Sequence, residues 1–137
     1  MSHYSEVEIE IRDRAALLAA LGRLGFTGDK VEVHETPKNL YGYEGGRRAQ
    51  TAHIIIRRQN VGTASNDLGF VRGADGNYKA IISEFDGRHG YGATWTGKLK
   101  QAYGVEKARA EAKKRGYRIK EETLPGGRVR LTLSGRR

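Results

Sequence analysis

The sequence predicts an α+β fold, in which two helices pack on one face of a mainly antiparallel sheet. Three observations support it: short strand-like runs along the chain, two helical segments toward its ends, and glycine-containing turns between neighbouring strands. A length of 137 residues with 37% apolar content is typical of one domain. We therefore expect residues 1–137 to form a single domain.

The first part of the chain predicts the order strand, helix, strand. Residues 7–11 (VEIEI) alternate apolar and acidic side chains, as a half-buried strand does. Asp13 is a good N-cap for the leucine-rich helix that follows, and Gly25 is suited to end that helix. Residues 30–35 (KVEVHE) alternate again, so they predict a strand with its two valines facing the core.

The middle of the chain predicts one long loop and three strands. Residues 36–50 hold a proline and three glycines, which favours a loop. Residues 52–58 (AHIIIRR) predict a central strand covered on both faces, because isoleucines pack well in a sheet. The runs at 68–73 and 77–85 predict two antiparallel strands, joined by a tight turn of the primed type at Asp75-Gly76.

The last third repeats the first in outline. A helix capped by Thr94 or Thr96 is expected to run to Arg115, and Gly116 is suited to end it. A hairpin follows over residues 117–133 and turns at a Pro-Gly-Gly sequence. The economical architecture is ferredoxin-like, with two β-α-β units and a C-terminal β-hairpin.

The positive charge is confined to the C-terminal third. Residues 1–92 hold 12 basic and 12 acidic residues, whereas residues 93–137 hold 13 basic and 4 acidic residues and so account for the net charge of +9. Such an asymmetry favours an acidic partner, either nucleic acid or an acidic protein. A solvated surface with no partner explains the charge about as well.

The composition also excludes several classes of site. With no cysteine, the chain has no disulfide, thiolate zinc site or thiol nucleophile, and it suits a reducing compartment. No long apolar run is present, so we expect neither a signal peptide nor a membrane span. The histidine spacing matches no zinc motif, and no phosphate-loop or hydrolase motif occurs, so no metal, cofactor or catalytic residue is expected.

The predicted C-terminal hairpin is the first candidate site. Strand alternation turns one set of side chains inward, namely Tyr117, Ile119, Val129, Leu131 and Leu133. It turns four cations outward together: Arg118, Lys120, Arg128 and Arg130. Lys113, Lys114 and Arg115 at the end of the preceding helix, and the Arg136-Arg137 tail, extend this basic surface.

The second candidate is the segment Ser65-Asn66-Asp67. It offers a hydroxyl, an amide and a carboxylate together, a set that could position a ligand. The same three residues are typical of an Asx turn that enters a strand, and this alternative is favoured. Arg47 and Arg48 lie in a glycine-containing stretch and could contact a phosphate, although a mobile loop tip is the favoured explanation.

Four stretches of the sequence resemble a known family: residues 1–26, residues 39–58 (NLYGYEGGRRAQTAHIIIRR), residues 65–86 (SNDLGFVRGADGNYKAIISEFD) and residues 95–101. The chain looks like a member of the family of hypothetical chloroplast open reading frame thirty-five, found in plastids, cyanobacteria and other bacteria. That family has no established activity, so the resemblance implies no catalytic residues. Its members tend to be encoded near AAA+ ATPase genes, which implies an accessory subunit of an ATPase-associated assembly.

The leading interpretation is therefore a small non-enzymatic binding or adaptor protein whose basic surface engages nucleic acid or an acidic protein. The alternative is a small enzyme or ligand-binding domain that uses the Ser65-Asn66-Asp67 loop. We expect the bacterial cytosol as its location, or the plastid stroma if the gene is plastid-encoded. The sequence leaves open the partner's identity and whether the chain forms a homo-oligomer.

Overall fold

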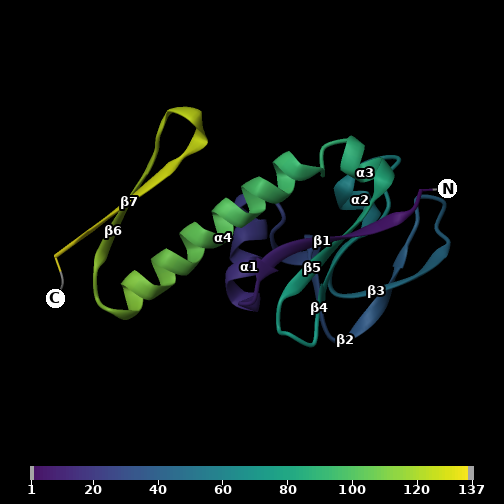
Figure 1. Ribbon diagram of the computed structural model, residues 1–137, viewed down its shortest axis with the longest axis horizontal. Coiled ribbons are helices and arrows are strands. Elements are labelled where there is room, and N and C mark those ends of the chain that lie inside the picture. Colours follow the sequence, from purple (N-terminus) through teal and green to yellow (C-terminus); the bar gives the residue numbers. More distant parts are fainter. Residues whose placement is uncertain (1, 136–137) are drawn as a thin grey trace.

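The computed structural model describes residues 2–135 and confirms the predicted fold class (Figure 1). In chain order the elements are β1 (Tyr4–Ile11), α1 (Arg14–Arg23), η1 (Gly28–Lys30), β2 (Glu32–Tyr41), β3 (Arg47–Ile56), α2 (Arg58–Val61), β4 (Leu68–Arg72), β5 (Tyr78–Ser83), α3 (Glu84–Arg88), α4 (Ala93–Lys114), β6 (Arg118–Thr123), η2 (Pro125–Gly127) and β7 (Val129–Ser134). The predicted arginine tail, Arg136-Arg137, lies outside the described residues.

Five strands form one antiparallel sheet in the order β1-β5-β4-β3-β2. The strands that flank α1 lie at opposite edges of this sheet, and β6 pairs with β7 in a second, two-stranded sheet. The likeness to a ferredoxin-like fold therefore extends to the class and to the two helices on one face, but not to the order of the strands.

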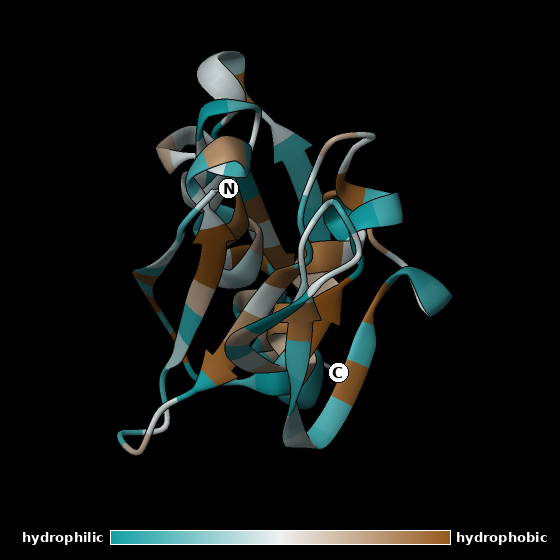
Figure 2. Ribbon diagram, turned by 90° about the vertical axis from the view of Figure 1, so that its right-hand side faces the viewer, coloured by the Kyte–Doolittle hydropathy of each residue, from teal (hydrophilic) through white to brown (hydrophobic). Residues whose placement is uncertain are grey.

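The main core lies between the sheet and the helices α1 and α4. Leu21 of α1 and Leu99 of α4 pack there against Ile54 and Phe70 of the sheet, and all four are fully buried. Ile55 points to the opposite face and is equally buried, so the prediction of an interior strand covered on both faces is confirmed. Figure 2 shows the hydrophobic stretches gathered in the strands and hydrophilic or neutral residues in most connecting turns.

A smaller core lies on the other face of the sheet. It consists of Leu40, Ala52, Ile55 and Ile81. Gly69 makes the close approach possible, because a Cβ there would lie 2.6 Å from the Ala52 Cβ and 3.1 Å from Leu40 Cδ2. The absent side chain thus lets Leu40 of β2 and Ala52 of β3 pack closely against the backbone of β4.

The two long helices end in the same way. Gly25 and Gly116 have φ values of 99° and 83°, and the aromatic residue after each donates its N–H to the carbonyl five residues earlier, at 2.9 and 3.0 Å. At the other end of α1, the Asp13 carboxylate accepts from the Ala16 N–H at 3.0 Å. The N-cap at Asp13 and both glycine exits are therefore confirmed.

The prediction of a long loop over residues 36–50 is wrong. The strand β2 continues to Tyr41 and β3 begins at Arg47, so only a tight turn joins them. Pro37 is tolerated because β2 is an edge strand, where one row of N–H groups needs no partner. The register also shifts between Val33 and Lys38, and such a bulge accommodates residues that interrupt a regular ladder.

Three local predictions are also corrected. Val33 is 43% exposed rather than inward, because it lies on the edge strand. Neither threonine caps α4, which begins at Ala93 with Gly92 as its N-cap. The turn between β4 and β5 is present, but its one residue with positive φ is Gly76, at 88°, so it is not the primed two-residue type.

Candidate functional site

The register of the C-terminal hairpin places the predicted basic residues on one face. Arg118 pairs with Ser134, Lys120 with Thr132, and Glu122 with Arg130, so these side chains point to the same side. Arg118, Lys120 and Arg130 are exposed, as is Arg128 at the end of the turn. We call these four residues the basic face of the hairpin.

The opposite side of the hairpin packs against α4. Ile119, Val129 and Leu131 are half-buried there, while Leu133 remains 47% exposed. The Gln101 side chain of α4 donates to the Gly127 carbonyl at 2.9 Å. The hairpin thus presents its basic face to solvent because its apolar face is turned toward the helix.

A charged cluster anchors the hairpin to both helices. Arg23 of α1 donates two hydrogen bonds to the Glu121 carboxylate of β6, at 2.6 and 2.8 Å, and also pairs with Glu106 of α4. Arg109 of α4 lies 3.4 Å from the same Glu121. The Arg23 guanidinium holds the pKa of Glu121 below its ordinary value.

The cations near the end of α4 have a structural explanation. Lys113 and Lys114 lie in the last helical turn, where positive charge interacts favourably with the free carbonyls. Arg115 pairs with Glu111 at 2.9 Å. Within residues 2–135, by contrast, no carboxylate lies within 4.0 Å of the charged groups of Arg118, Lys120 or Arg128, although Arg130 lies 3.7 Å from Glu122.

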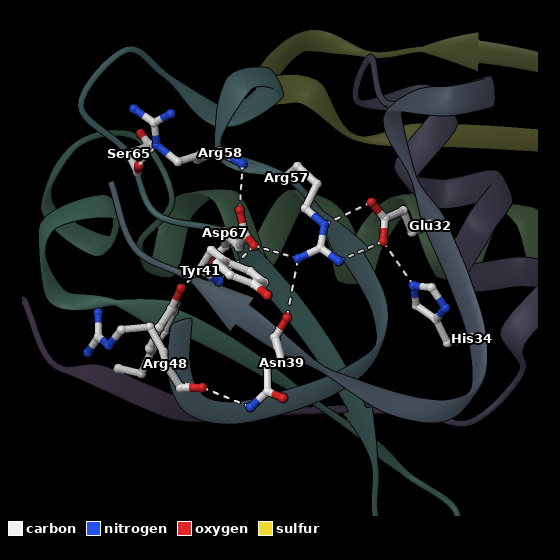
Figure 3. Close-up of polar contacts among 10 residues, drawn as sticks. Glu32, His34, Asn39, Tyr41, Arg48, Arg57, Arg58, Ser65 and Asp67 are labelled. Atoms are coloured by element: carbon white, nitrogen blue, oxygen red, sulfur yellow. Dashed lines mark hydrogen bonds and ion pairs between the residues drawn. The ribbon is translucent and has the colours of Figure 1, made fainter. Parts of the chain in front are cut away.

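The second candidate, Ser65-Asn66-Asp67, is buried rather than exposed, with at most 5% of each residue accessible. The Asp67 carboxylate accepts from the Tyr41 N–H at 2.8 Å, from Arg57 Nη1 at 2.7 Å and from the Arg58 N–H at 2.8 Å (Figure 3). These donors come from the ends of β2 and β3, so Asp67 ties both strands to the start of β4.

Arg57 extends this network to the edge of the sheet. Its guanidinium donates to both oxygens of Glu32 at 2.8 Å, and Glu32 also contacts the His34 ring at 2.9 Å (Figure 3). The bonds to Glu32, followed by those to Asp67, raise the pKa of Arg57. The bond from Arg57 is the main cause that lowers the pKa of Glu32. The pair is therefore held in its charged form.

Asn66 connects the network to α3. Its backbone N–H donates to Asp86 Oδ2 at 3.0 Å, and its side-chain amide donates to Ser83 Oγ at 2.9 Å. Its own Oδ1 accepts from the Tyr43 N–H at 3.1 Å. Asp86 lies inside α3 and is 1% exposed. The three residues therefore join distant segments and do not form a local Asx turn.

The two arginines of the glycine-containing stretch lie in different environments. Arg47 is exposed at the start of β3. The Arg48 guanidinium lies 4.7 Å from the centre of the Tyr4 ring and donates to the Ser2 carbonyl at 2.7 Å. The Tyr4 hydroxyl in turn donates to the Asp67 carbonyl at 2.6 Å, and burial raises the pKa of Tyr4.

Several residues of this network were missed in the sequence. Arg57 and Glu32 carry no local signal, because their partners come from other strands. Ser83 and Asp86 do carry a local signal, because the S-x-x-D spacing is typical of a helix N-terminus. The Asp86 N–H donates to Ser83 Oγ at 3.1 Å. Over the described part of the chain, no cluster of three metal-ligating side chains is present, and no helix is long and apolar enough to span a membrane.

Comparison with known proteins identifies the family. Residues 20–132 match the family model described as protein of unknown function (DUF1257). No curated protein and no solved structure matches the chain. The matched range includes both the buried polar network and the basic face of the hairpin. Because the model covers most of its length, the chain belongs to the DUF1257 family.

Proposed function

We propose that the protein is a non-enzymatic binding or adaptor protein whose basic hairpin face contacts the phosphate backbone of nucleic acid. The observation that supports this proposal is the placement of Arg118, Lys120 and Arg130 on one exposed face by the β6–β7 register. Same-face residues of a strand recur about every 7 Å. Arg118 and Lys120 have this spacing along β6, and Arg130 lies opposite the next position, Glu122, on β7. Cations placed in this way can contact neighbouring phosphates of a backbone.

The composition of this face favours nucleic acid over an acidic protein. The other side chains on this side of the hairpin are Glu122, Thr132 and Ser134, so no aromatic or large apolar side chain accompanies the basic face. The centre of a protein–protein interface is typically enriched in aromatic residues and depleted in lysine. Phosphate binding requires only cations and hydrogen-bond donors, which this face supplies.

A binding assay with a matched control tests the proposal. The hairpin variant replaces Arg118, Lys120, Arg128 and Arg130 with serine, and the control variant replaces the exposed Arg14, Lys30, Lys38 and Arg88 with serine, which removes the same charge. Fluorescence anisotropy with short labelled RNA and DNA is expected to show binding that only the hairpin variant loses. Equal loss in both variants would contradict a localised site.

An acidic protein partner would give a different result. In that case the wild-type chain would bind neither RNA nor DNA, and affinity capture from lysate would recover the same protein with and without nuclease treatment. The hairpin variant would then lose that protein. Capture that disappears after nuclease treatment supports the nucleic-acid proposal.

We also propose a closer relation to the chloroplast open reading frame thirty-five family, supported by residues 65–86, with a location in the cytosol or stroma. The tendency of that family's genes to neighbour AAA+ ATPase genes supports an accessory role in such an assembly. Co-purification of the tagged chain with an AAA+ ATPase from its native cells tests that role. Its absence from purified ATPase complexes would contradict it.

A further inference from the structure

A small cavity lies beneath the turn between β2 and β3, far from the hairpin. Its volume is about 50 Å³, several times the roughly 10–15 Å³ that one water needs. It is lined by Gly42, Tyr43, Glu44, Gly46, Arg48 and Asn66. The cavity is too small for a drug-sized molecule but has room for a small polar group.

One hydrogen-bond donor in the lining lacks a partner. Arg48 Nη1 is buried and makes no hydrogen bond within residues 2–135, whereas Nη2 of the same guanidinium donates to Ser2. Figure 3 shows the Arg48 guanidinium pointing away from Arg57, so it does not join that ion-pair chain. Buried guanidinium donors are normally satisfied, so an acceptor bound in the cavity would supply the hydrogen bond that this atom lacks.

Gly42 leaves the space in which that acceptor would sit. A Cβ at this position would lie 3.6 Å from Arg48 Nη1 and 3.4 Å from Asn66 Oδ1. Arg48 Nη1 and the side-chain oxygen of Asn66 therefore border the same small volume. The Asn66 side chain is fixed by its bonds to Tyr43 and Ser83, so this wall of the cavity is preorganised.

We infer that this cavity binds a carboxylate group, with Arg48 Nη1 as its charged donor. A carboxylate supplies an acceptor of the right charge and size, and its hydrogen bond to a guanidinium is stronger than one to a neutral acceptor. The carboxylate can belong to a small organic acid or to the C-terminus of a peptide. This inference does not depend on the function proposed for the hairpin.

Glu44 lines the same cavity and provides a second test of the ligand's charge. Its carboxylate lies at the same cavity and accepts a hydrogen bond from the Tyr43 hydroxyl, which raises the pKa of Tyr43. A second carboxylate would be repelled by this charge. Glu44→Gln should therefore tighten binding of an anion, and it should weaken binding of a cation.

The test is an NMR titration of the full chain with sodium acetate, compared with sodium chloride at equal ionic strength. We expect saturable shifts of the Gly42, Tyr43 and Asn66 amides with acetate only. Arg48→Gln should weaken binding by at least about tenfold, because a charge-assisted bond is lost. The neighbouring exposed Arg47→Gln should leave the affinity unchanged.

A second variant keeps the test valid if Arg48→Gln fails to fold. Gly42→Ala fills the cavity, yet its Cβ makes only ordinary contacts and its backbone φ is not positive, so it should fold and lose binding. Acetyl-diglycine as the free acid, compared with its amide, separates the two sources: tighter binding than acetate indicates a chain terminus, and equal binding a small acid. Shifts that do not saturate with any carboxylate, or that are unchanged in Gly42→Ala, would show that the cavity holds water and overturn the inference.

Discussion

The carboxylate of Asp67 joins three strand ends through its bonds to the backbone of Tyr41 and Arg58 and to the guanidinium of Arg57. We expect Asp67→Ala to lower the free energy of unfolding by about 3–5 kcal/mol, because it removes one of the two carboxylates that pair with Arg57 and leaves two buried backbone donors without their acceptor. Urea denaturation measures this loss.

A surface ion pair provides the control for that prediction. Glu35 pairs with Arg14 at 3.2 Å and its side chain is 88% exposed. Glu35→Ala should change the free energy of unfolding by less than about 1 kcal/mol. An equally small change for Asp67→Ala would show that the buried network contributes little to stability.

The Glu32–Arg57 pair predicts a pH dependence. The pKa of Glu32 is lower in the folded chain than its unfolded value of about 4.3. Its contribution to stability is therefore complete above that value and is lost as the pH falls through the folded pKa. Urea midpoints should decrease on acidification, and less so in Arg57→Met, which removes the main cause of the shift. An identical decrease in both proteins would contradict this assignment.

At the residue scale, the sequence predicts what depends on neighbouring residues. The N-cap at Asp13 and the helix end at Gly25 follow from local chemistry, and both are present. The partners of Asp67 could not be predicted, because Arg57 and Tyr41 meet it only after three strands have paired. Burial of Ser65-Asn66-Asp67 likewise depends on the surrounding fold.

At the scale of elements, the packing of the Leu40 and Ala52 side chains of β2 and β3 against β4 depends on Gly69. Gly69→Ala should destabilise the fold by about 1–3 kcal/mol, because its Cβ would overlap that of Ala52. Ala52→Gly in the same chain should recover part of the loss, as measured by urea denaturation. No recovery in the double variant would rule out this contact as the cause.

Gly104 provides a control that separates this packing effect from the intrinsic cost of glycine in an element. Gly104 lies in the middle of α4, and a Cβ there would meet nothing within 4 Å. Gly104→Ala should therefore raise the free energy of unfolding by about 1 kcal/mol, through helix propensity alone. Destabilisation of similar size at both glycines would contradict the specific role of Gly69.

The attachment of the hairpin to the helices can be tested in the same way. Arg23 bridges Glu121 of β6 and Glu106 of α4. Arg23→Ala should speed hydrogen exchange in β6 and β7, because their anchor is lost, and should leave the interior strands β4 and β5 protected. Uniformly faster exchange would indicate that the hairpin and the sheet unfold together.

The length of β2 shows why some elements were not predicted. Proline and three glycines within residues 36–50 are typical of a loop, yet β2 continues to Tyr41 because an edge strand tolerates Pro37. Whether a strand lies at an edge is a property of the assembled sheet. By contrast, the C-terminal hairpin combines alternation with a Pro-Gly-Gly turn, so local sequence was sufficient to predict it.

At the scale of the whole molecule, the boundary between the neutral and the basic part of the chain coincides with the boundary between the sheet and α4. The sheet and α1 lie within the electrically balanced residues 1–92, whereas α4 and the hairpin lie within the basic remainder. Figure 1 shows the hairpin at one end of the molecule, beside α4 and away from the edge strand β2. This arrangement leaves the basic face open to a large partner.

The salt dependence of nucleic-acid affinity tests the central claim most directly. If four cations of the hairpin contact phosphates, replacing all four with serine should reduce the slope of log affinity against log salt concentration by about 3. The serine variant of Arg14, Lys30, Lys38 and Arg88 should keep the wild-type slope. A wild-type slope near zero, or equal slopes in all three proteins, would contradict phosphate binding by the basic face.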